Sequence, residues 1–390
     1  MINKIISVLI VVVTTLVTTK IVDVSVGIYS GFEEDKKTEV KPRTIVLREY
    51  TLNSNDMLAP YGNYKENTEN LEYKKYRVRS DDNGFIIGPK DLLENVKSQN
   101  VDIIFFGGST TESLFVDEEI RFPYLVSEML VNHNGNTLRV LNGGLSGNNT
   151  LHSILAYQAK GIPLKPKYVI LMHAINDLSA LSKSLSYWET TSGRDIVRSQ
   201  IYDNVDMYED RGRIYKFFRV MKDAFLPNIW KKIRGFVAQR IDSSIAVDEW
   251  ADFRNKKLNS NDIEQALKYQ YKNALLTFVK VSRIWGSEPI LMTQFNRLRS
   301  DDIFVKKLYE KNKQPLSYNE FIRLYEICNN IIREVAEQEK VLLIDLEKNI
   351  EPNSRFIYDA VHLNNNGSKV AAEIIAEALA KNFSPYLVKK

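Results

Sequence analysis

Short apolar runs alternate with longer amphipathic stretches from residue 101 to the end of the chain. The apolar runs have the length of β-strands, and they are nearly continuous in hydrophobicity, as expected of strands buried on both faces. They are Val101–Phe106, Leu138–Leu141, Tyr168–Met172, Pro289–Thr293 and Val341–Ile344. The pattern predicts an α/β fold in which a five-stranded, mainly parallel, doubly wound sheet carries helices on its faces.

Three stretches between and after these runs have helical periodicity. The first, Asn261–Trp285, ends at a glycine and places on one face Ile263, Leu267, Tyr271, Ala274, Phe278, Val281 and Trp285. Residues 317–320 read SYNE, a capping box that opens a helix running to about Gln338. A last helix is expected from about Ser368 to Asn382.

The N-terminal region differs from the rest. Ile5–Val17 lies between Lys4 and Lys20 without a charge, which predicts a signal anchor or signal peptide over residues 1–28. An uncleaved anchor makes the protein a single-pass cell-membrane protein with its main domain extracytoplasmic. If the segment is cleaved, the protein is secreted or periplasmic. The alternative without any targeting role is that the segment is a buried N-terminal element of a cytosolic protein.

The remainder divides into two parts by composition. Residues 29–95 are polar and irregular, which predicts a stalk that joins an edge segment of the main domain. Residues 96–390 form that domain, with a long helical insertion at 180–260.

Composition narrows the classes of protein. The chain has 390 residues, of which 44% are hydrophobic and 26% charged, and this is a globular composition. A net charge of +4 is too balanced for binding nucleic acid through the whole chain. The single cysteine, Cys328, excludes an internal disulfide and any cysteine-rich metal site, and we expect it to be buried.

Candidate chemistry lies just after the apolar runs, because ligands bind beyond the carboxyl ends of strands in open parallel sheets. After the first three runs, residues 107–111 read GGSTT, residues 142–150 read NGGLSGNNT and residues 173–177 read HAIND, and before the last expected helix residues 359–362 read DAVH. Two glycines before Ser109 let the chain turn sharply and present a hydroxyl at the start of a helix. Together these positions are typical of an acyl-transfer site.

The reaction explains the residue types. A serine hydroxyl needs a base, and His362 has the pKa for this role with Asp359 to orient its ring. Backbone N–H groups of Ser109 and Gly147 and the side-chain amide of Asn176 supply three donors for an oxyanion.

These four blocks resemble, in order and spacing, the SGNH branch of the GDSL hydrolases over residues 76–382. The resemblance implies a flavodoxin-like three-layer α/β/α fold, serine esterase or acylhydrolase activity, and no metal or organic cofactor. Two positions depart from the family pattern. Gly108 stands where the family has aspartate, and Ala174 stands where it has glycine.

Each block also has an ordinary structural interpretation. A serine after glycines is often a helix cap, and Asp-x-x-His occurs by chance in surface turns. The first block lacks the spacing and lysine of a P-loop, and Thr111 replaces the second glycine of the α/β-hydrolase elbow. We further expect Gly108, Thr110, His173 and Asp177 at the pocket, with His173 alternatively a core histidine and Asp177 a brace for its loop.

The insertion carries a basic, aromatic stretch. Residues 211–240 contain nine Lys or Arg and one acid, with interleaved aromatic side chains. Such a stretch binds anionic membrane surfaces or acidic glycans, or it packs as a helical flap with a solvated basic face. The expected partners are an acylated carbohydrate or lipid substrate and the membrane, and not nucleic acid.

The sequence thus predicts a serine esterase that removes O-acyl groups, with O-acetyl first, from an envelope or exported carbohydrate. Two alternatives stay open: an O-acyltransferase that uses the same residues, and a non-catalytic envelope or glycan-binding protein on the same scaffold.

Overall fold

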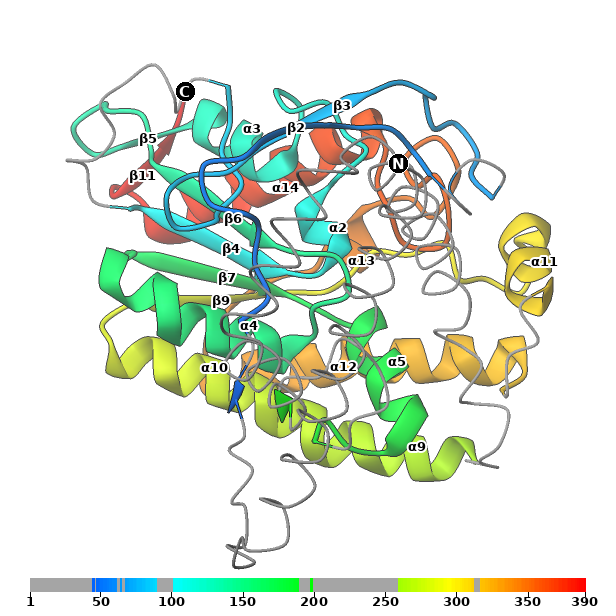
Figure 1. Ribbon diagram of the computed structural model, residues 1–390. Coiled ribbons are helices and arrows are strands. Elements are labelled where there is room, and N and C mark those ends of the chain that lie inside the picture. Colours follow the sequence, from blue (N-terminus) through cyan, green and yellow to red (C-terminus); the bar gives the residue numbers. More distant parts are fainter. Residues whose placement is uncertain are drawn as a thin grey trace, which may run out of the picture. The chain divides into compact units, whose positions relative to one another are not determined.

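The computed structural model describes residues 44–45, 47–61, 64, 67–89, 101–188, 197–198, 259–311 and 316–390 (Figure 1). Apart from Thr44, they belong to one compact unit made of Ile45–Arg198 and Arg213–Lys390. A second unit comprises Met1–Thr44 and Ser199–Gly212. The predicted anchor at 1–28 and the basic stretch at 211–240 lie outside the described residues. Among the helices that are described, none has the length and hydrophobicity needed to cross a membrane.

The five predicted strands are present and form one sheet. They are β4 (Ile103–Gly107), β6 (Val140–Gly144), β7 (Tyr168–Met172), β9 (Glu288–Met292) and β10 (Leu342–Ile344). Their order is β10-β9-β7-β4-β6, and every neighbouring pair is parallel. Numbered along the chain this is the order 2-1-3-4-5 read from the opposite edge, which is the flavodoxin-like arrangement. The prediction of a five-stranded parallel sheet is confirmed.

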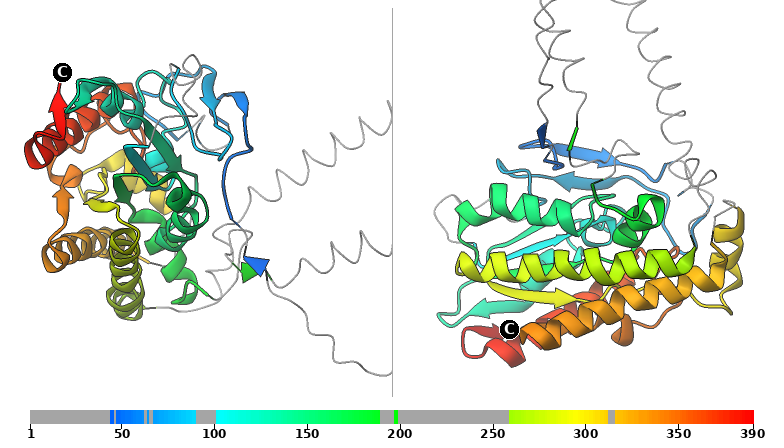
Figure 2. Two further views of the ribbon diagram at one scale, coloured as in Figure 1. Left: turned by 90° about the vertical axis from the view of Figure 1, so that its left-hand side faces the viewer. Right: turned by 90° about the horizontal axis from the view of Figure 1, so that it is seen from below.

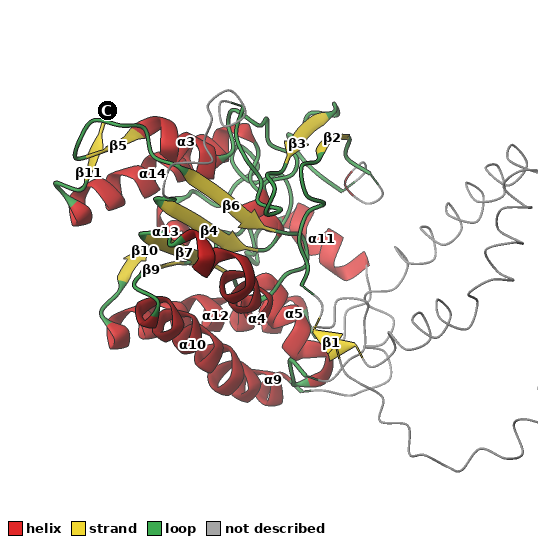
Figure 3. Ribbon diagram, turned by 60° about the vertical axis from the view of Figure 1, so that its left-hand side comes forward, coloured by secondary structure: helices red, strands yellow, loops and turns green. Residues whose placement is uncertain are grey.

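Helices cover both faces of the sheet (Figures 2 and 3). On one face lie α3 (Phe122–Met129), α13 (Leu346–Asn349) and α14 (Asn365–Phe383). On the other lie α4 (Thr150–Ala156), α5 (Ile175–Ser184), α9 (Ser260–Ala266), α10 (Lys272–Ile284) and α12 (Tyr318–Glu339). Two separate hydrophobic cores, one on each side of the sheet, hold the three layers together.

The helix expected over Asn261–Trp285 is interrupted. A π-helical turn, η6 (Leu267–Tyr271), separates α9 from α10. Five of the seven predicted inward residues are buried, but Trp285 is 61% exposed. The prediction for Trp285 is wrong because the helix ends at Ile284, so that Trp285 has left the helical face.

The other two predicted helices are present, with small differences at their ends. Ser317 and Glu320 form the expected capping box at the start of α12, and Cys328 within that helix is buried. The last helix begins three residues earlier than expected, because the side chain of Asn364 caps it by accepting from two backbone N–H groups.

The described part of the 29–95 segment packs on the domain as an edge segment. Strands β2 (Asn55–Leu58) and β3 (Tyr76–Arg79) pair antiparallel. Farther along the segment, the backbone of Ile86 forms two hydrogen bonds with the backbone of Asn142 in β6, which joins the segment to the sheet. Phe85 and Val78 are fully buried. We call residues 47–61 the strap.

The remaining elements are short. They are β1 (Thr44–Ile45) paired with β8 (Val197–Arg198), β5 (Leu130–Asn132) paired with β11 (Leu387–Lys389), α2 (Ser109–Glu112), η3 (Tyr157–Gly161), η4 (Ile162–Leu164) and α11 (Ile303–Lys311). Of the insertion predicted at 180–260, most lies outside the described residues.

Candidate active site

Two loops at the carboxyl edge of the sheet bring together a serine, a histidine and an aspartate. Ser109 opens the short helix α2 directly after β4. His362 Nε2 lies 2.8 Å from Ser109 Oγ, and His362 Nδ1 lies 2.7 Å from Asp359 Oδ2. These are the contacts that a nucleophile, its base and an orienting carboxylate require.

The local backbone sets the Asp359–His362 pair. Residues Ile357 and Leu363 form an isolated antiparallel bridge, and the Tyr358 N–H donates to the His362 carbonyl at 2.8 Å, which closes a tight turn. Asp359 Oδ1 accepts from the backbone N–H groups of Val361 and His362 at 2.9 and 2.8 Å. One oxygen thus fixes the turn, and the other remains for the imidazole.

The electrostatics of the pair suit a general base. Burial alone raises the pKa of Asp359, but the His362 ring and the backbone donors outweigh burial and hold this pKa below its usual value. Burial disfavours the imidazolium of His362, yet the charge and hydrogen bond of Asp359, aided by Glu112, raise the pKa of His362. The imidazolium that forms when serine loses its proton is therefore stabilised.

The predicted oxyanion donors lie on the two neighbouring loops. Gly147, after β6, has φ +79°, a conformation that side chains with a Cβ rarely adopt. Asn176 lies in the first turn of α5, and its Nδ2 donates one hydrogen to the Asn148 carbonyl at 2.8 Å. A side-chain amide has two N–H hydrogens, so the second is available for an oxyanion.

Gly108 is packed against this amide. A Cβ at position 108 would lie 2.3 Å from Asn176 Nδ2 and 3.1 Å from the Asn148 carbonyl oxygen. No side chain fits there while Asn176 keeps its position, which gives a packing reason for glycine where the GDSL pattern has aspartate.

Three of the residues predicted to line the pocket are buried instead. Thr110, His173 and Asp177 are 2%, 1% and 0% exposed. Thr110 Oγ1 accepts from Gln294 Nε2 at 2.7 Å, and His173 Nε2 lies 2.7 Å from Ser153 Oγ. We therefore correct the pocket assignment of these three: His173 is a core histidine.

Asp177 has the role that its position suggested. Its carboxylate accepts from the Thr150 backbone N–H at 3.0 Å and from the Tyr187 hydroxyl. Burial raises the pKa of Asp177 to about 6, against the lowering effect of these donors. The side chain braces its loop against α4.

Sequence reasoning missed the aromatic rings around His362. The Tyr358 ring stacks on it at 5.6 Å between centroids, and the Tyr64 ring meets it edge-on at 5.9 Å. Tyr61, which is 64% exposed, contacts Tyr64 in turn. The available signal was the density of four tyrosines within residues 61–76, in a segment interpreted as polar.

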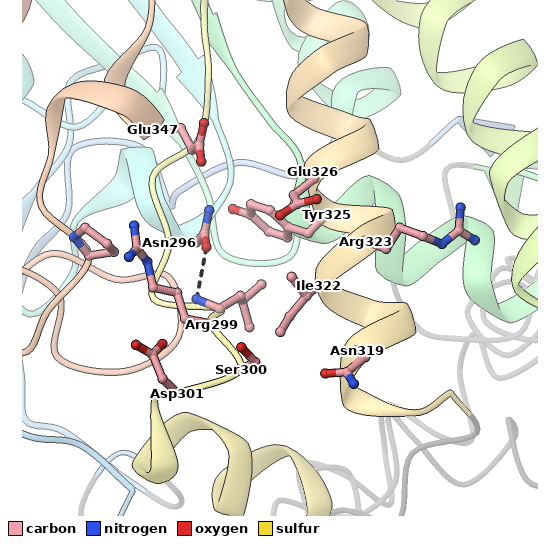
Figure 4. Close-up of a pocket in the computed structure, with 12 residues that line it drawn as sticks. Asn296, Arg299, Ser300, Asp301, Asn319, Ile322, Arg323, Tyr325, Glu326 and Glu347 are labelled. Atoms are coloured by element: carbon pink, nitrogen blue, oxygen red, sulfur yellow. Dashed lines mark hydrogen bonds between the residues drawn. The ribbon is translucent and has the colours of Figure 1, made fainter.

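A separate pocket of about 730 Å³ opens beside the loop after β9 (Figure 4). It is lined by Asn296, Leu298, Arg299, Ser300, Asp301, Asn319, Ile322, Arg323, Tyr325, Glu326, Glu347 and Pro352. Its wall connects to α2, because the Tyr325 hydroxyl donates to Gln294 and Gln294 donates to Thr110, each at 2.7 Å. The lining carries both charge signs, so this is a polar cleft rather than an apolar channel.

In the described part of the chain, no group of three His, Cys, Asp or Glu side chains is placed to hold a metal ion.

The comparisons with known proteins found similarity to solved structures at low sequence identity. No protein-family model matches the chain, and no curated protein matches it significantly. Structural neighbours include GDSL-like lipases and acetylxylan esterases. A GDSL-like lipase from Bacteroides thetaiotaomicron has 11% identity and a TM-score of 0.38, with 75% of this chain and 96% of that chain covered.

Two further solved structures are similar at this level. The acetylxylan esterase Axe2 from Geobacillus stearothermophilus has 15% identity and a TM-score of 0.36, with 73% of this chain and 97% of that chain covered. LAE5, an α/β hydrolase enzyme from the metagenome of Lake Arreo in Spain, has 16% identity and a TM-score of 0.38, with coverages of 71% and 94%.

Proposed function

We propose that this protein is a serine esterase or acylhydrolase. The observation that carries the proposal is the unbroken chain of contacts from Ser109 through His362 to Asp359, at 2.8 and 2.7 Å. A serine, a neutral imidazole and a carboxylate in this order form the machinery of acyl transfer.

The geometry supports a two-step reaction. His362 Nε2 takes the Ser109 proton while Oγ bonds to the carbonyl carbon, and the N–H groups of Ser109, Gly147 and Asn176 stabilise the oxyanion. The ester C–O bond then breaks, and the alcohol leaves with the proton from His362. Water attacks the acyl-enzyme with His362 again as base, which releases the carboxylic acid and restores Ser109.

The substrate we propose is an O-acyl group, with O-acetyl first, on an envelope or exported carbohydrate. Because His362 protonates the leaving alcohol, the alcohol lies on the histidine side of the site. Tyr64 and the exposed Tyr61 line that side, and amphipathic tyrosine rings suit the mixed polar and apolar faces of a sugar. The apolar run Ile5–Val17 supports a membrane-tethered, extracytoplasmic location.

The chemistry is tested by covalent labelling. A fluorophosphonate should modify wild-type protein once, with mass spectrometry of the peptides placing the adduct on Ser109, and the Ser109→Ala variant should not react. Steady release of p-nitrophenol from p-nitrophenyl acetate should be lost in the same variant. A folded wild-type protein that neither reacts nor turns over is the outcome expected of a non-catalytic glycan-binding protein, and it would end the esterase proposal.

Hydrolysis and transfer are separated by the acceptor. With p-nitrophenyl acetate and an added oligosaccharide, an esterase releases acetate in step with p-nitrophenol, whereas a transferase leaves acetylated oligosaccharide. Mass spectrometry of envelope polysaccharide from cells with wild-type or Ser109→Ala protein tests the natural substrate. An identical acyl pattern in both would contradict the carbohydrate assignment.

A further inference from the structure

Glu112 is a buried acid that the proposed reaction does not use. It lies three residues after Ser109 at the end of α2 and is only 2% exposed. An acid at such depth costs free energy unless its oxygens are hydrogen-bonded. Its partners therefore indicate what it does.

Two hydroxyl groups satisfy its carboxylate. The Tyr50 hydroxyl donates to Oε1, and the Ser146 hydroxyl donates to Oε2. Burial and the neighbouring carboxylate raise the pKa of Tyr50, so this phenol keeps its proton and stays a donor. The pKa of Glu112 is raised, because burial outweighs the lowering effect of the hydroxyl donors and the positive charge of Arg121.

Ser146 directly precedes Gly147, the proposed backbone donor to the oxyanion. Its side chain is held by Glu112, and its carbonyl accepts from Arg48 Nη2 at 3.0 Å. The turn is thus held from the nucleophile helix on one side and from the strap on the other. Gly147 itself has φ +79° and no side chain that could hold it in place.

We propose that Glu112 is a positioning residue that, together with Tyr50 and Arg48 of the strap, fixes the Ser146–Gly147 turn so that the Gly147 N–H stays aimed at the oxyanion. This inference rests on the proposed esterase function. The proposal makes the strap part of the active site, although Arg48 lies 98 positions before Ser146 in the sequence.

The physical reason is the sensitivity of oxyanion stabilisation to geometry. Loss of one donor costs about 10²- to 10³-fold in kcat, and a displacement of about 1 Å can cost about 10²-fold. In a loosened turn the Gly147 N–H is still present, but it occupies the position that binds the oxyanion for a smaller fraction of the time. The expected loss is therefore about 10- to 100-fold in kcat, with KM changed little because the ground-state carbonyl depends less on this donor.

Two variants separate position from charge. Glu112→Gln removes the charge and replaces one of the two acceptor oxygens by an NH₂ group that cannot accept a hydroxyl donor, and Ser146→Ala removes the serine hydroxyl and keeps the charge. Each should lower kcat for p-nitrophenyl acetate by about 10- to 100-fold, and each should slow fluorophosphonate labelling of Ser109 by a similar factor, because the phosphoryl oxygen occupies the same hole. Tyr157→Phe is the control for losing a buried hydroxyl hydrogen bond elsewhere in the domain, since it removes the tyrosine hydroxyl bonded to Ser287 and should change neither rate.

The outcomes are distinct. If both variants keep wild-type kcat and labelling rates per folded molecule, the positioning role is wrong, whatever happens to thermal stability. If Glu112→Gln alone is impaired, its charge acts on His362 and the positioning role is again wrong. Failure of the esterase proposal has a different signature, because the wild-type protein itself would then neither hydrolyse the ester nor react with the probe.

Discussion

The described part of the domain holds two serine–histidine–aspartate arrangements, one at the carboxyl edge of the sheet and one in the protein interior. They are Ser109–His362–Asp359, here the open triad, and Ser153–His173–Asp177, here the buried triad. In the open triad the serine–histidine and histidine–aspartate distances are 2.8 and 2.7 Å. In the buried triad they are 2.7 and 3.7 Å. Residue identity and proximity alone do not distinguish a nucleophile.

Burial and charge make the difference. Every member of the buried triad is 1% exposed or less, whereas the His362 side chain is 15% exposed. Burial, with a smaller contribution from His152, lowers the pKa of His173 to about 3, but the pKa of His362 is raised. A base must accept a proton near neutral pH and must reach substrate, and only the open triad meets both conditions.

The buried triad instead joins secondary-structure elements. Ser153 lies on α4, His173 follows β7, and Asp177 lies on α5. The Tyr271 hydroxyl also donates to the His173 carbonyl at 2.6 Å. These bonds hold in place the start of α5, where Asn176 lies, so the buried set supports the geometry of the open one.

The largest expected difference between the two sets concerns the serines. Ser109→Ala should lower kcat for p-nitrophenyl acetate by about 10⁴-fold or more, because the nucleophile is gone. Ser153→Ala should leave kcat within about threefold and instead lower thermal stability, because it leaves His173 without its buried partner. Initial rates and thermal unfolding of both variants are the measurements. Equal losses of activity would contradict the assignment of the open triad.

Substitutions at the two aspartates should differ in their effect on kcat by a similar factor. In Asp359→Asn the amide oxygen still accepts the two backbone N–H groups, so the NH₂ group faces His362 Nδ1 and imposes the wrong tautomer. The expected loss is about 10⁴-fold in kcat with the fold intact. Asp177→Asn should retain activity within about tenfold and lower the unfolding temperature, since its carboxylate accepts two buried donors.

This pair has a clear contrary result. A fully active Asp359→Asn enzyme would show that the carboxylate does not orient the base, and an inactive but stable Asp177→Asn enzyme would give the buried set a chemical role.

Asn176 sharpens the comparison, because it is the side chain that we propose as an oxyanion donor to the open triad. Asn176→Ala should lower kcat about 10²- to 10³-fold, equivalent to about 3 to 4 kcal/mol of transition-state stabilisation, with little change in KM. Asn382→Ala is the matched control, since its amide also donates to a backbone carbonyl, at 2.8 Å from Ala378 O, but in the last turn of α14. A variant at 176 with unchanged kcat would remove the side-chain amide from the oxyanion hole.

Much of the fold could be predicted because its signals are local. The central strands are buried on both faces and therefore read as continuous apolar runs. The Ser317–Glu320 capping box marks the start of α12 within four residues. Strand β6 runs to Gly144, beyond the end predicted from the sequence. The prediction stopped early because the last residues of the strand are glycines, which carry no hydrophobic signal. Ser109 could be found for the same reason, since it lies just after β4, whereas Asp359 and His362 lie shortly before α14.

The rest of the site depends on contacts between distant segments. Tyr50 and Glu112 are 62 positions apart, and nothing in the pattern around either residue indicates the other. Tyr64 belongs to a segment whose polar composition conceals its packing against His362. His173 was placed at the pocket because it follows a strand, but the residue after a strand can turn into the helix layer, where burial and Ser153 give it a structural role.

The smallest expected effect is the pH dependence of the activity. Titration of the two histidines is the most direct test of which one acts as the base. His362 must be neutral to take the serine proton, and its pKa is raised above the ordinary 6.5. The value of kcat/KM should therefore fall as the pH falls, with its midpoint above about 6.5. His173, with a pKa of about 3, should stay neutral throughout this range.

Histidine side-chain NMR spectra recorded from pH 8 to pH 5 separate the two titrations, with resonances assigned by His362→Ala and His173→Gln variants. The His362 signals should move with the same midpoint as kcat/KM, because one ionisation governs both. The His173 signals should stay in place, because burial disfavours the imidazolium more than the Asp177 carboxylate, 3.7 Å from His173 Nδ1, stabilises it. If His173 titrates near neutrality while His362 does not, the two sets have been assigned the wrong way round.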